Sequence, residues 1–116
     1  MIQLRIEHEI ARRQADEGMG RALDRAERDV PKWGDTAFAR IVAYAERHPT
    51  FAGWMVVKAA ALDPNFPQPE NERAWGGPMQ RAARERIIER AGTVKDPNRH
   101  GNPIPLWRSL VYRGAA

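Results

Sequence analysis

The spacing of apolar residues at the start of the chain predicts two helices separated by glycine. Residues 1–17 follow a helical pattern, but Gly18 and Gly20 interrupt it, and glycine is unfavourable inside a helix. We therefore expect the first helix to fray before Gly18 and a second, short helix to follow over residues 19–28. Large apolar residues are sparse here, so we interpret residues 1–32 as an N-terminal helical extension.

The next two helices are predicted from clearer patterns. Asp35 is a suitable N-cap for a helix that Pro49 ends near His48. Its apolar positions follow the i, i+3, i+4, i+7 rule of an amphipathic helix: Phe38, Ile41, Val42 and Ala45. Thr50 is the expected cap of the following helix, which ends before Asp63. One face of that helix carries Trp54, Val57 and Ala61.

A proline-rich segment precedes a third predicted helix. Residues 63–71 contain three prolines in nine positions and are expected to form a loop. A helix then runs from about Asn71 to Arg86, with an apolar stripe of Trp75, Met79, Ala82 and Ala83. Pro78 conflicts with this pattern because it lacks a backbone donor. The helix is either kinked or becomes regular only at Pro78, and we favour the kink.

The last part of the chain predicts a β-hairpin. Residues 87–94 and 104–112 contain β-branched and aromatic residues, and the turn-forming residues 95–103 separate them. Pro105 lies near the start of the second strand, where an edge strand tolerates proline.

Three helices followed by a hairpin is the element order of a winged helix-turn-helix. The sequence thus predicts a mainly α fold with a small β-hairpin, built as a three-helix core with a C-terminal wing. This domain covers residues 33–112, which hold most of the larger apolar residues, and residues 113–116 form a tail. In DNA-binding members of this class the third helix enters the major groove, and the hairpin loop contacts the adjacent backbone or minor groove.

The distribution of charge favours a polyanionic partner. The 116 residues include 19 lysines and arginines and 15 acidic residues, which gives a formal net charge of +4. Residues 70–116 contain nine basic and five acidic side chains, so the whole excess lies there. A small domain with a basic end is typical of nucleic-acid binding, although a solvated face explains the same charge.

Two groups of polar residues are candidate DNA contacts. On the third helix, the residues off the apolar stripe are Arg73, Gln80, Arg81 and Arg84. Arginine can bind guanine and glutamine can bind adenine, but a solvated helix face with Glu72 and Glu85 is the alternative. In the hairpin loop, cations and amide donors suited to phosphates are Lys95, Asn98, Arg99 and His100. For the loop, an ordinary polar turn is the alternative.

The four tryptophans are assigned to the core. Trp75 and Trp107 could stack on bases, as aromatic residues do in proteins that bind single strands. Tryptophan in an apolar stripe is more often buried, and we apply the same interpretation to Trp33 and Trp54.

Other classes of function lack their signatures. The chain has no cysteine, which excludes disulfides and thiolate metal sites. His8, His48 and His100 lack metal-ligand spacing, and there is no nucleophile elbow or phosphate loop. We therefore expect no metal, no cofactor and no enzymatic activity. Without an apolar run of about 18 residues or a signal peptide, we expect a cytoplasmic protein with no membrane contact.

Four segments of the chain resemble small winged-helix proteins of phages and prophages. They are W-G-D-x-A at Trp33–Ala37, H-P-T-F at His48–Phe51, R-A-W-G-G-x-M-Q-R-A-A-R at Arg73–Arg84 and I-P-L-W-R-S-L at Ile104–Leu110. The resemblance spans about residues 18–112 and implies a compact winged helix in a bacterial host cell, encoded near phage replication or recombination functions. The chain departs from it where Arg86, Ile87 and Ile88 replace Gly-Leu-Ile, which puts the end of the third helix in question.

Two functions follow from these observations. The first is a non-enzymatic protein that binds double-stranded DNA and acts in phage DNA replication or transcriptional regulation. The second is a winged-helix protein-interaction module that binds and inhibits a host replication or defence protein. Ile6 and Ile10 lie one turn apart in a charge-balanced segment, so the N-terminal helix is the candidate homodimer contact, with a frayed tail as the alternative.

Overall fold

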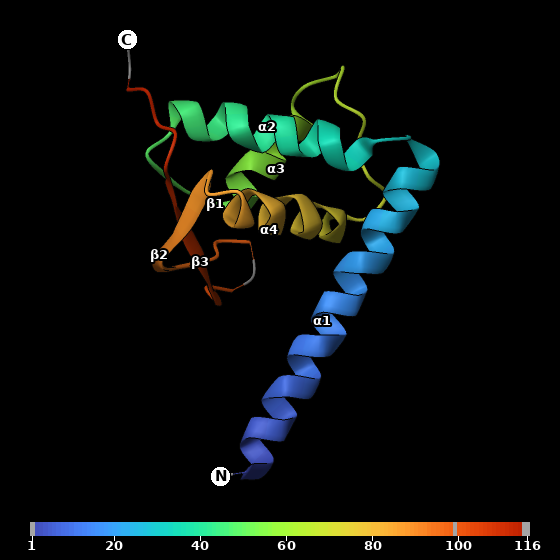
Figure 1. Ribbon diagram of the computed structural model, residues 1–116, viewed down its shortest axis with the longest axis vertical. Helices are drawn as coiled ribbons and strands as arrows, with labels where there is room; N and C mark the ends of the chain where they lie inside the picture. Colours follow the sequence, from blue (N-terminus) through green and yellow to red (C-terminus); the bar gives the residue numbers. More distant parts are fainter. Residues whose placement is uncertain (1, 99, 115–116) are drawn as a thin grey trace.

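The computed structural model describes residues 2–98 and 100–114, with side chains from residue 13 onward. Within these residues, about half of the chain is helical and three strands form a small antiparallel sheet (Figure 1). The elements, in chain order, are α1 (Ile2–Asp29), α2 (Trp33–Arg47), β1 (Thr50–Ala52), α3 (Gly53–Ala61), η1 (Glu72–Trp75), α4 (Gly76–Arg84), β2 (Ile88–Lys95) and β3 (Pro103–Ser109).

The first helix, α1, is continuous, so the predicted break at Gly18 and Gly20 is wrong. A glycine inside a helix costs only about 1 kcal/mol relative to alanine. Packing of the second half of α1 offsets this cost, because Ala22 and Ala26 are buried in the core of the protein. The first half extends away from the other elements (Figure 1). Proline ends the helix as predicted, since α1 stops two residues before Pro31.

The second helix, α2, begins three residues earlier than predicted, with Lys32 instead of Asp35 as its N-cap. Lys32, in the left-handed conformation with a φ of 62°, precedes Trp33, and Asp35 lies in the first turn instead of at the N-cap. A carboxylate in the first turn still interacts favourably with the positive end of the helix. The prediction that Pro49 ends the helix is confirmed, with His48 as C-cap. The buried residues are Trp33, Ala37, Ile41 and Ala45, while Phe38 and Val42 are half-buried.

A short strand replaces the predicted cap of the next helix. Thr50 begins β1, and α3 starts only at Gly53, so the assignment of Thr50 as an N-cap is wrong. Because β1 pairs with β3, residue 50 lies opposite Arg108, far along the chain. The face of α3 also differs from the predicted one, since Val56 and Ala60 are the residues it buries.

The region predicted as one kinked helix consists of a 3-10 turn followed by α4. Asn71 caps the turn, and its side chain accepts a hydrogen bond from the Arg73 backbone at 2.9 Å. The change from 3-10 to α geometry occurs between Trp75 and Gly76, so Pro78 is the third residue of α4. In the first turn of a helix the backbone donors have no partner within the helix, and proline is tolerated there.

The predicted hairpin of β2 and β3 is confirmed, but β3 is the central strand of the sheet, between β1 and β2. The assignment of Pro105 to an edge strand is therefore wrong. Its missing donor is tolerated because β1 pairs only with residues 106–108 of β3, which leaves Pro105 with β2 alone as a neighbour. The pairing of β2 shifts between Arg90 and Thr93, where Gly92 has a φ of 114° that suits a bulge.

Three aromatic residues from separate segments form the centre of the core. The ring of Trp33 lies 5.3 Å from Trp75 and 6.4 Å from Phe66, and Phe66 stacks on Trp75 at 5.4 Å. Phe66 belongs to the predicted loop of residues 63–71, so this loop is fixed on the core. Trp33 and Trp75 are buried as predicted, and Trp107 packs against the core while half-exposed.

Candidate nucleic-acid interface

One predicted contact on α4, Arg81, is engaged in interactions within the protein. Its guanidinium donates hydrogen bonds to Glu85 at 2.6 Å and to Asp35 at 2.9 Å. It also lies over the ring of Phe38, 3.9 Å from the ring centre. The carboxylates of Glu85 and Asp35 raise the pKa of Arg81 above its ordinary value. Arg81 thus joins α4 to α2, and a nucleic acid would have to compete with these contacts.

The other predicted residues near α4 have different surroundings, although Gln80 and Arg84 lie one turn apart on the same face of the helix. Arg73 and Gln80 line a groove between α4 and α1, whereas Arg84 is exposed at the last residue of the helix. Among described residues, the side chains of Arg73 and Arg84 form no ion pair. The structure therefore does not bring the four predicted residues together on one face.

The first helix covers the beginning of α4. A Cβ atom built on Gly76 would lie 2.2 Å from the Met19 sulfur, and one built on Gly77 would lie 2.7 Å from a methyl group of Leu23. These two glycines allow α1 and α4 to pack closely. On the side of α4 that faces α1, only the second half of the helix is left uncovered.

The hairpin loop is held by Asp96, whose side chain and backbone organise the turn. The Asp96 carboxylate accepts a hydrogen bond from the Asn98 backbone at 2.8 Å, and its carbonyl accepts one from Gly101 at 2.9 Å. Lys95, Asn98 and His100 are exposed around this buried aspartate. The fourth predicted loop residue, Arg99, lies outside the described residues. Because all of β2 separates the loop from α4, the loop and Arg84 are at opposite ends of an eight-residue strand.

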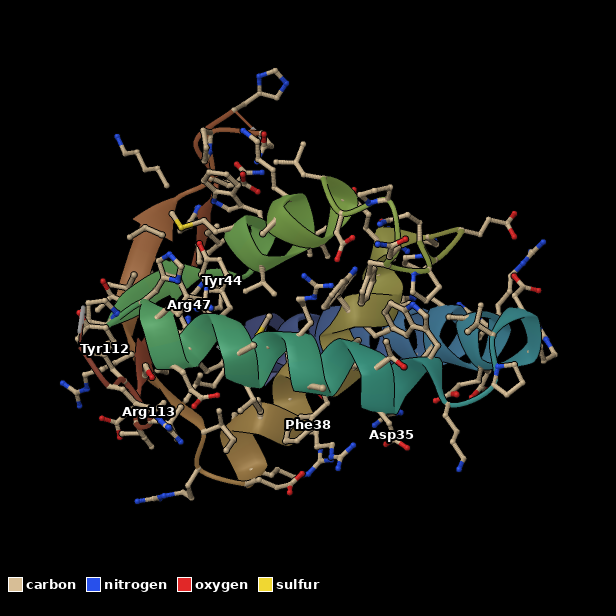
Figure 2. All side chains as sticks on the ribbon, turned by 90° about the horizontal axis from the view of Figure 1, so that it is seen from above. Asp35, Phe38, Tyr44, Arg47, Tyr112 and Arg113 are labelled. Carbon is tan, nitrogen blue, oxygen red and sulfur yellow. The ribbon has the colours of Figure 1, made fainter. Side chains whose placement is uncertain are left out.

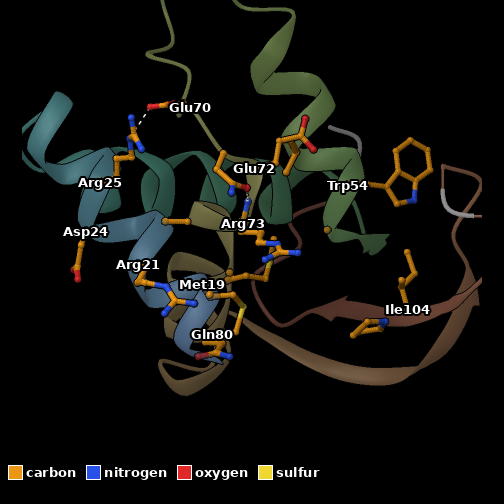
Figure 3. A pocket seen from close by; sticks show the side chains of 18 of the residues that line it. Met19, Arg21, Asp24, Arg25, Trp54, Glu70, Glu72, Arg73, Gln80 and Ile104 are labelled. Carbon is orange, nitrogen blue, oxygen red and sulfur yellow. Dashed lines mark hydrogen bonds and ion pairs between the residues drawn. The ribbon is translucent and has the colours of Figure 1, made fainter. Parts of the chain in front are cut away.

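The groove that contains Arg73 and Gln80 has a volume of about 1220 Å³ and is also lined by Trp54 and Trp107. Figure 3 shows Trp54 and Ile104 on one side, facing Met19, Arg73 and Gln80 on the other. The prediction that Trp54 is a core residue is wrong, because it is half-exposed and borders this groove. The helical pattern placed Trp54 on the apolar face, but Val56 and Ala60 occupy that position.

Two further properties of the described residues bear on the candidate chemistry. No three histidine or acidic side chains are grouped closely enough there to hold a metal ion. No helix in residues 2–98 and 100–114 has both the length and the apolar character needed to cross a membrane.

Comparisons of the chain with protein-family models, with curated proteins and with solved structures find no match. The resemblance to winged-helix proteins of phages therefore stays a prediction from the sequence.

Proposed function

We propose that this protein is a winged-helix module that binds double-stranded DNA. In this proposal α2, α3 and α4 are the three core helices, and the hairpin of β2 and β3 is the wing. The phage origin and the role in replication or transcriptional regulation remain predictions from the resemblance.

The observation that carries the proposal is the order of the elements together with the order of the strands. A short strand lies between the first two core helices, the hairpin follows the third, and β3 occupies the middle of the sheet. A winged helix has this connectivity. Its third helix and its wing are the parts that approach DNA in members of the class that bind it.

The packing of α1 limits how α4 can approach a duplex. Recognition helices of this kind usually contact bases through their N-terminal residues. Here Met19 and Leu23 cover that part of α4, so the approach falls to Gln80 and Arg84 in its second half. With Arg81 engaged elsewhere, we expect contacts to phosphates to outnumber contacts to bases, and binding to depend more on salt than on sequence.

Replacement of single cations tests this mode. Arg84→Gln and Lys95→Gln are each expected to reduce the salt slope of duplex binding by about one, which corresponds to the loss of one phosphate contact. Arg13→Gln is the matched control, since Arg13 is exposed in the first half of α1, which extends away from the other elements (Figure 1). Fluorescence anisotropy with a random duplex measures all three. Unchanged slopes for both Arg84→Gln and Lys95→Gln would refute contact by α4 and the wing.

A second candidate function, binding of a protein partner, is favoured by the groove. Trp54 exposes an aromatic surface there, and the arginines along the rim are balanced by acidic residues: Arg21, Arg25, Arg28 and Arg73 against Asp24, Glu70, Glu72 and Asp96. Aromatic residues are enriched in protein interfaces. Binding through this groove would be weakened by Trp54→Ala and would change little with salt, whereas DNA binding by α4 would show the reverse pattern.

A further inference from the structure

At one end of the molecule lies a group of arginines of which only Arg84 is a predicted DNA contact. Backbone hydrogen bonds join three segments there: Ser109 donates to Pro49 at 2.9 Å, Leu110 to Ile87 at 2.9 Å and Arg113 to Glu46 at 3.1 Å. They bring together the end of α2, the turn from α4 into β2, and the residues that follow β3. We call this region, residues 46–50, 84–90 and 108–113, the basic end.

The carboxylates of the basic end already have partners. Glu46 pairs with Arg113 at 2.9 Å, Glu85 with Arg81 at 2.6 Å, and Glu89 with Arg108. Four exposed arginines of the same region form no ion pair among the described residues: Arg47, Arg84, Arg86 and Arg90. The basic end as a whole contains six arginines and three glutamates, which gives it a formal charge of +3.

A second observation concerns the backbone conformation of Arg86, at the turn from α4 into β2. Arg86 has a φ of 62°, in the left-handed region that glycine adopts far more readily than other residues. It follows the C-cap of α4, where its N–H donates to Ala83 at 3.2 Å and that of Ile87 donates to Ala82 at 2.9 Å. Glycine is the usual residue at this position of such a helix end. Lys32 and His100 share this conformation, so the conformation alone does not indicate a function; at Arg86 it turns the chain from α4 into β2 and leaves the arginine exposed between Arg84 and Arg90.

Aromatic side chains lie near Arg47, one of these arginines (Figure 2). Tyr112 is 41% exposed, and Tyr44 stacks on His48 with a ring separation of 3.9 Å. Figure 2 shows Tyr44, Arg47, Tyr112 and Arg113 together at one end of α2, well away from Asp35. Arginine offers forked donors that fit phosphate oxygens, and tyrosine hydroxyls add further donors.

We propose that the basic end binds the phosphate backbone of double-stranded DNA, beside the part of α4 that carries Arg84. The inference rests on the proposed function for the identity of the partner. It adds a contact surface that lies at the opposite end of β2 from the hairpin loop. Since Arg84 belongs to both surfaces, a duplex that contacts α4 extends over Arg86 and Arg90.

The sharpest test compares two triple variants of equal charge in the full chain. Arg47→Gln, Arg86→Gln and Arg90→Gln together remove three charges from the basic end, and Arg13→Gln, Lys32→Gln and Lys58→Gln remove three exposed charges that lie outside the basic end, α4, the wing and the groove. For the first triple we expect a salt slope smaller by about two to three and a duplex affinity at least about tenfold lower at about 50 mM salt. The control triple is expected to keep a slope within about one of the unmodified chain.

Arg86→Gly separates a binding role from a structural one. Glycine relieves the left-handed conformation, so the thermal midpoint is expected to rise by roughly 4 °C. Duplex affinity should fall nevertheless, with a slope smaller by about one. A rise in stability with unchanged DNA binding would refute a role for Arg86.

The outcomes distinguish this inference from the proposed function. Equal losses in the two triple variants would overturn the basic end as a specific surface. If only Arg84→Gln and Lys95→Gln weaken binding, the basic end is refuted while the proposed function stands. If the unmodified chain fails to bind a duplex even at low salt, both are refuted.

Discussion

Two tryptophans at the centre of the core differ in whether the indole N–H has a partner. The Nε1 atom of Trp33 donates to the Pro67 carbonyl at 2.8 Å, which fastens the loop after α3 to α2. The Nε1 atom of Trp75 is buried and has no hydrogen-bond partner in the part of the chain that the structure describes. A buried polar group without a partner loses its hydration and gains nothing in return.

Replacing each tryptophan by phenylalanine exposes this difference. Both substitutions remove a similar volume, but only Trp33→Phe also breaks a hydrogen bond and leaves the Pro67 carbonyl without its donor. We expect Trp33→Phe to lower the free energy of unfolding by about 1–2 kcal/mol more than Trp75→Phe does. Urea denaturation followed by circular dichroism measures both values. Equal losses would contradict the assignment of the Trp33 hydrogen bond.

The contribution of Asp63 to the stability of the fold is expected to depend on pH. A hydrogen bond from Arg40 at 2.6 Å, and another from the Asn65 backbone, lower the pKa of Asp63 below its ordinary value of 3.8. A carboxyl group whose pKa is lower in the folded state stabilises the fold above the unfolded pKa. This stabilisation is lost as the pH falls through the pKa of the folded state.

Asp63→Asn is therefore expected to destabilise the protein at pH 7, and the difference from the unmodified chain should shrink as the pH falls below about 4. Denaturation curves at pH 7, 5, 4 and 3 provide the measurement. A difference that stays constant over this range would show that the ionised form of Asp63 contributes nothing.

At the scale of elements, the packing of α1 on α4 decides which part of α4 is accessible. Glycine has no side chain, so two helices can approach closely where a glycine of one faces the other. The glycines of α1 and α4 differ in whether a neighbouring side chain occupies the space beside them. Gly76 faces Met19, whereas a Cβ atom on Gly20 would meet nothing within 4 Å.

This contrast gives a matched pair of substitutions. Gly20→Ala is expected to stabilise α1 by up to about 1 kcal/mol, because alanine favours the helix and has free space. Gly76→Ala should destabilise the protein, since the added methyl group overlaps Met19. Met19→Ala in the Gly76→Ala background should restore part of the loss. Thermal unfolding measures the three variants, and stabilisation by Gly76→Ala would contradict close packing of α1 on α4.

Sequence patterns predicted the elements that depend on local signals and missed those that depend on distant partners. Proline acts on its immediate neighbours, so the helix ends before Pro31 and Pro49 were predictable. The strand β1 has three residues, and its register is set by pairing of Thr50 with Arg108. In the candidate site, Arg81 is bound to Asp35, 46 residues away, and no local pattern indicates that contact.

At the scale of the whole molecule, the distribution of unpaired charge supports the proposed partner. The chain has a formal net charge of +4, and four arginines of the basic end have no carboxylate partner among the residues that the structure describes. The acidic residues of the groove, by contrast, balance the arginines there. A polyanion is therefore expected to approach the end of the sheet where β2 begins.

The shape of the molecule adds a separate expectation about assembly. Its extents are 50 × 33 × 29 Å, and the first half of α1 accounts for much of the long dimension (Figure 1). A helix that lacks packing partners is marginal in water. The homodimer predicted through this segment would supply them, and sedimentation equilibrium across a range of protein concentrations tests that prediction.

The measurement that tests the central claim most directly is the affinity of the full chain for a random DNA duplex, followed by fluorescence anisotropy at three salt concentrations. DNA binding through exposed arginines predicts a micromolar or tighter dissociation constant at low salt, with log affinity falling steeply as log salt rises. Absence of binding at low salt, or an affinity that does not change with salt, would contradict it.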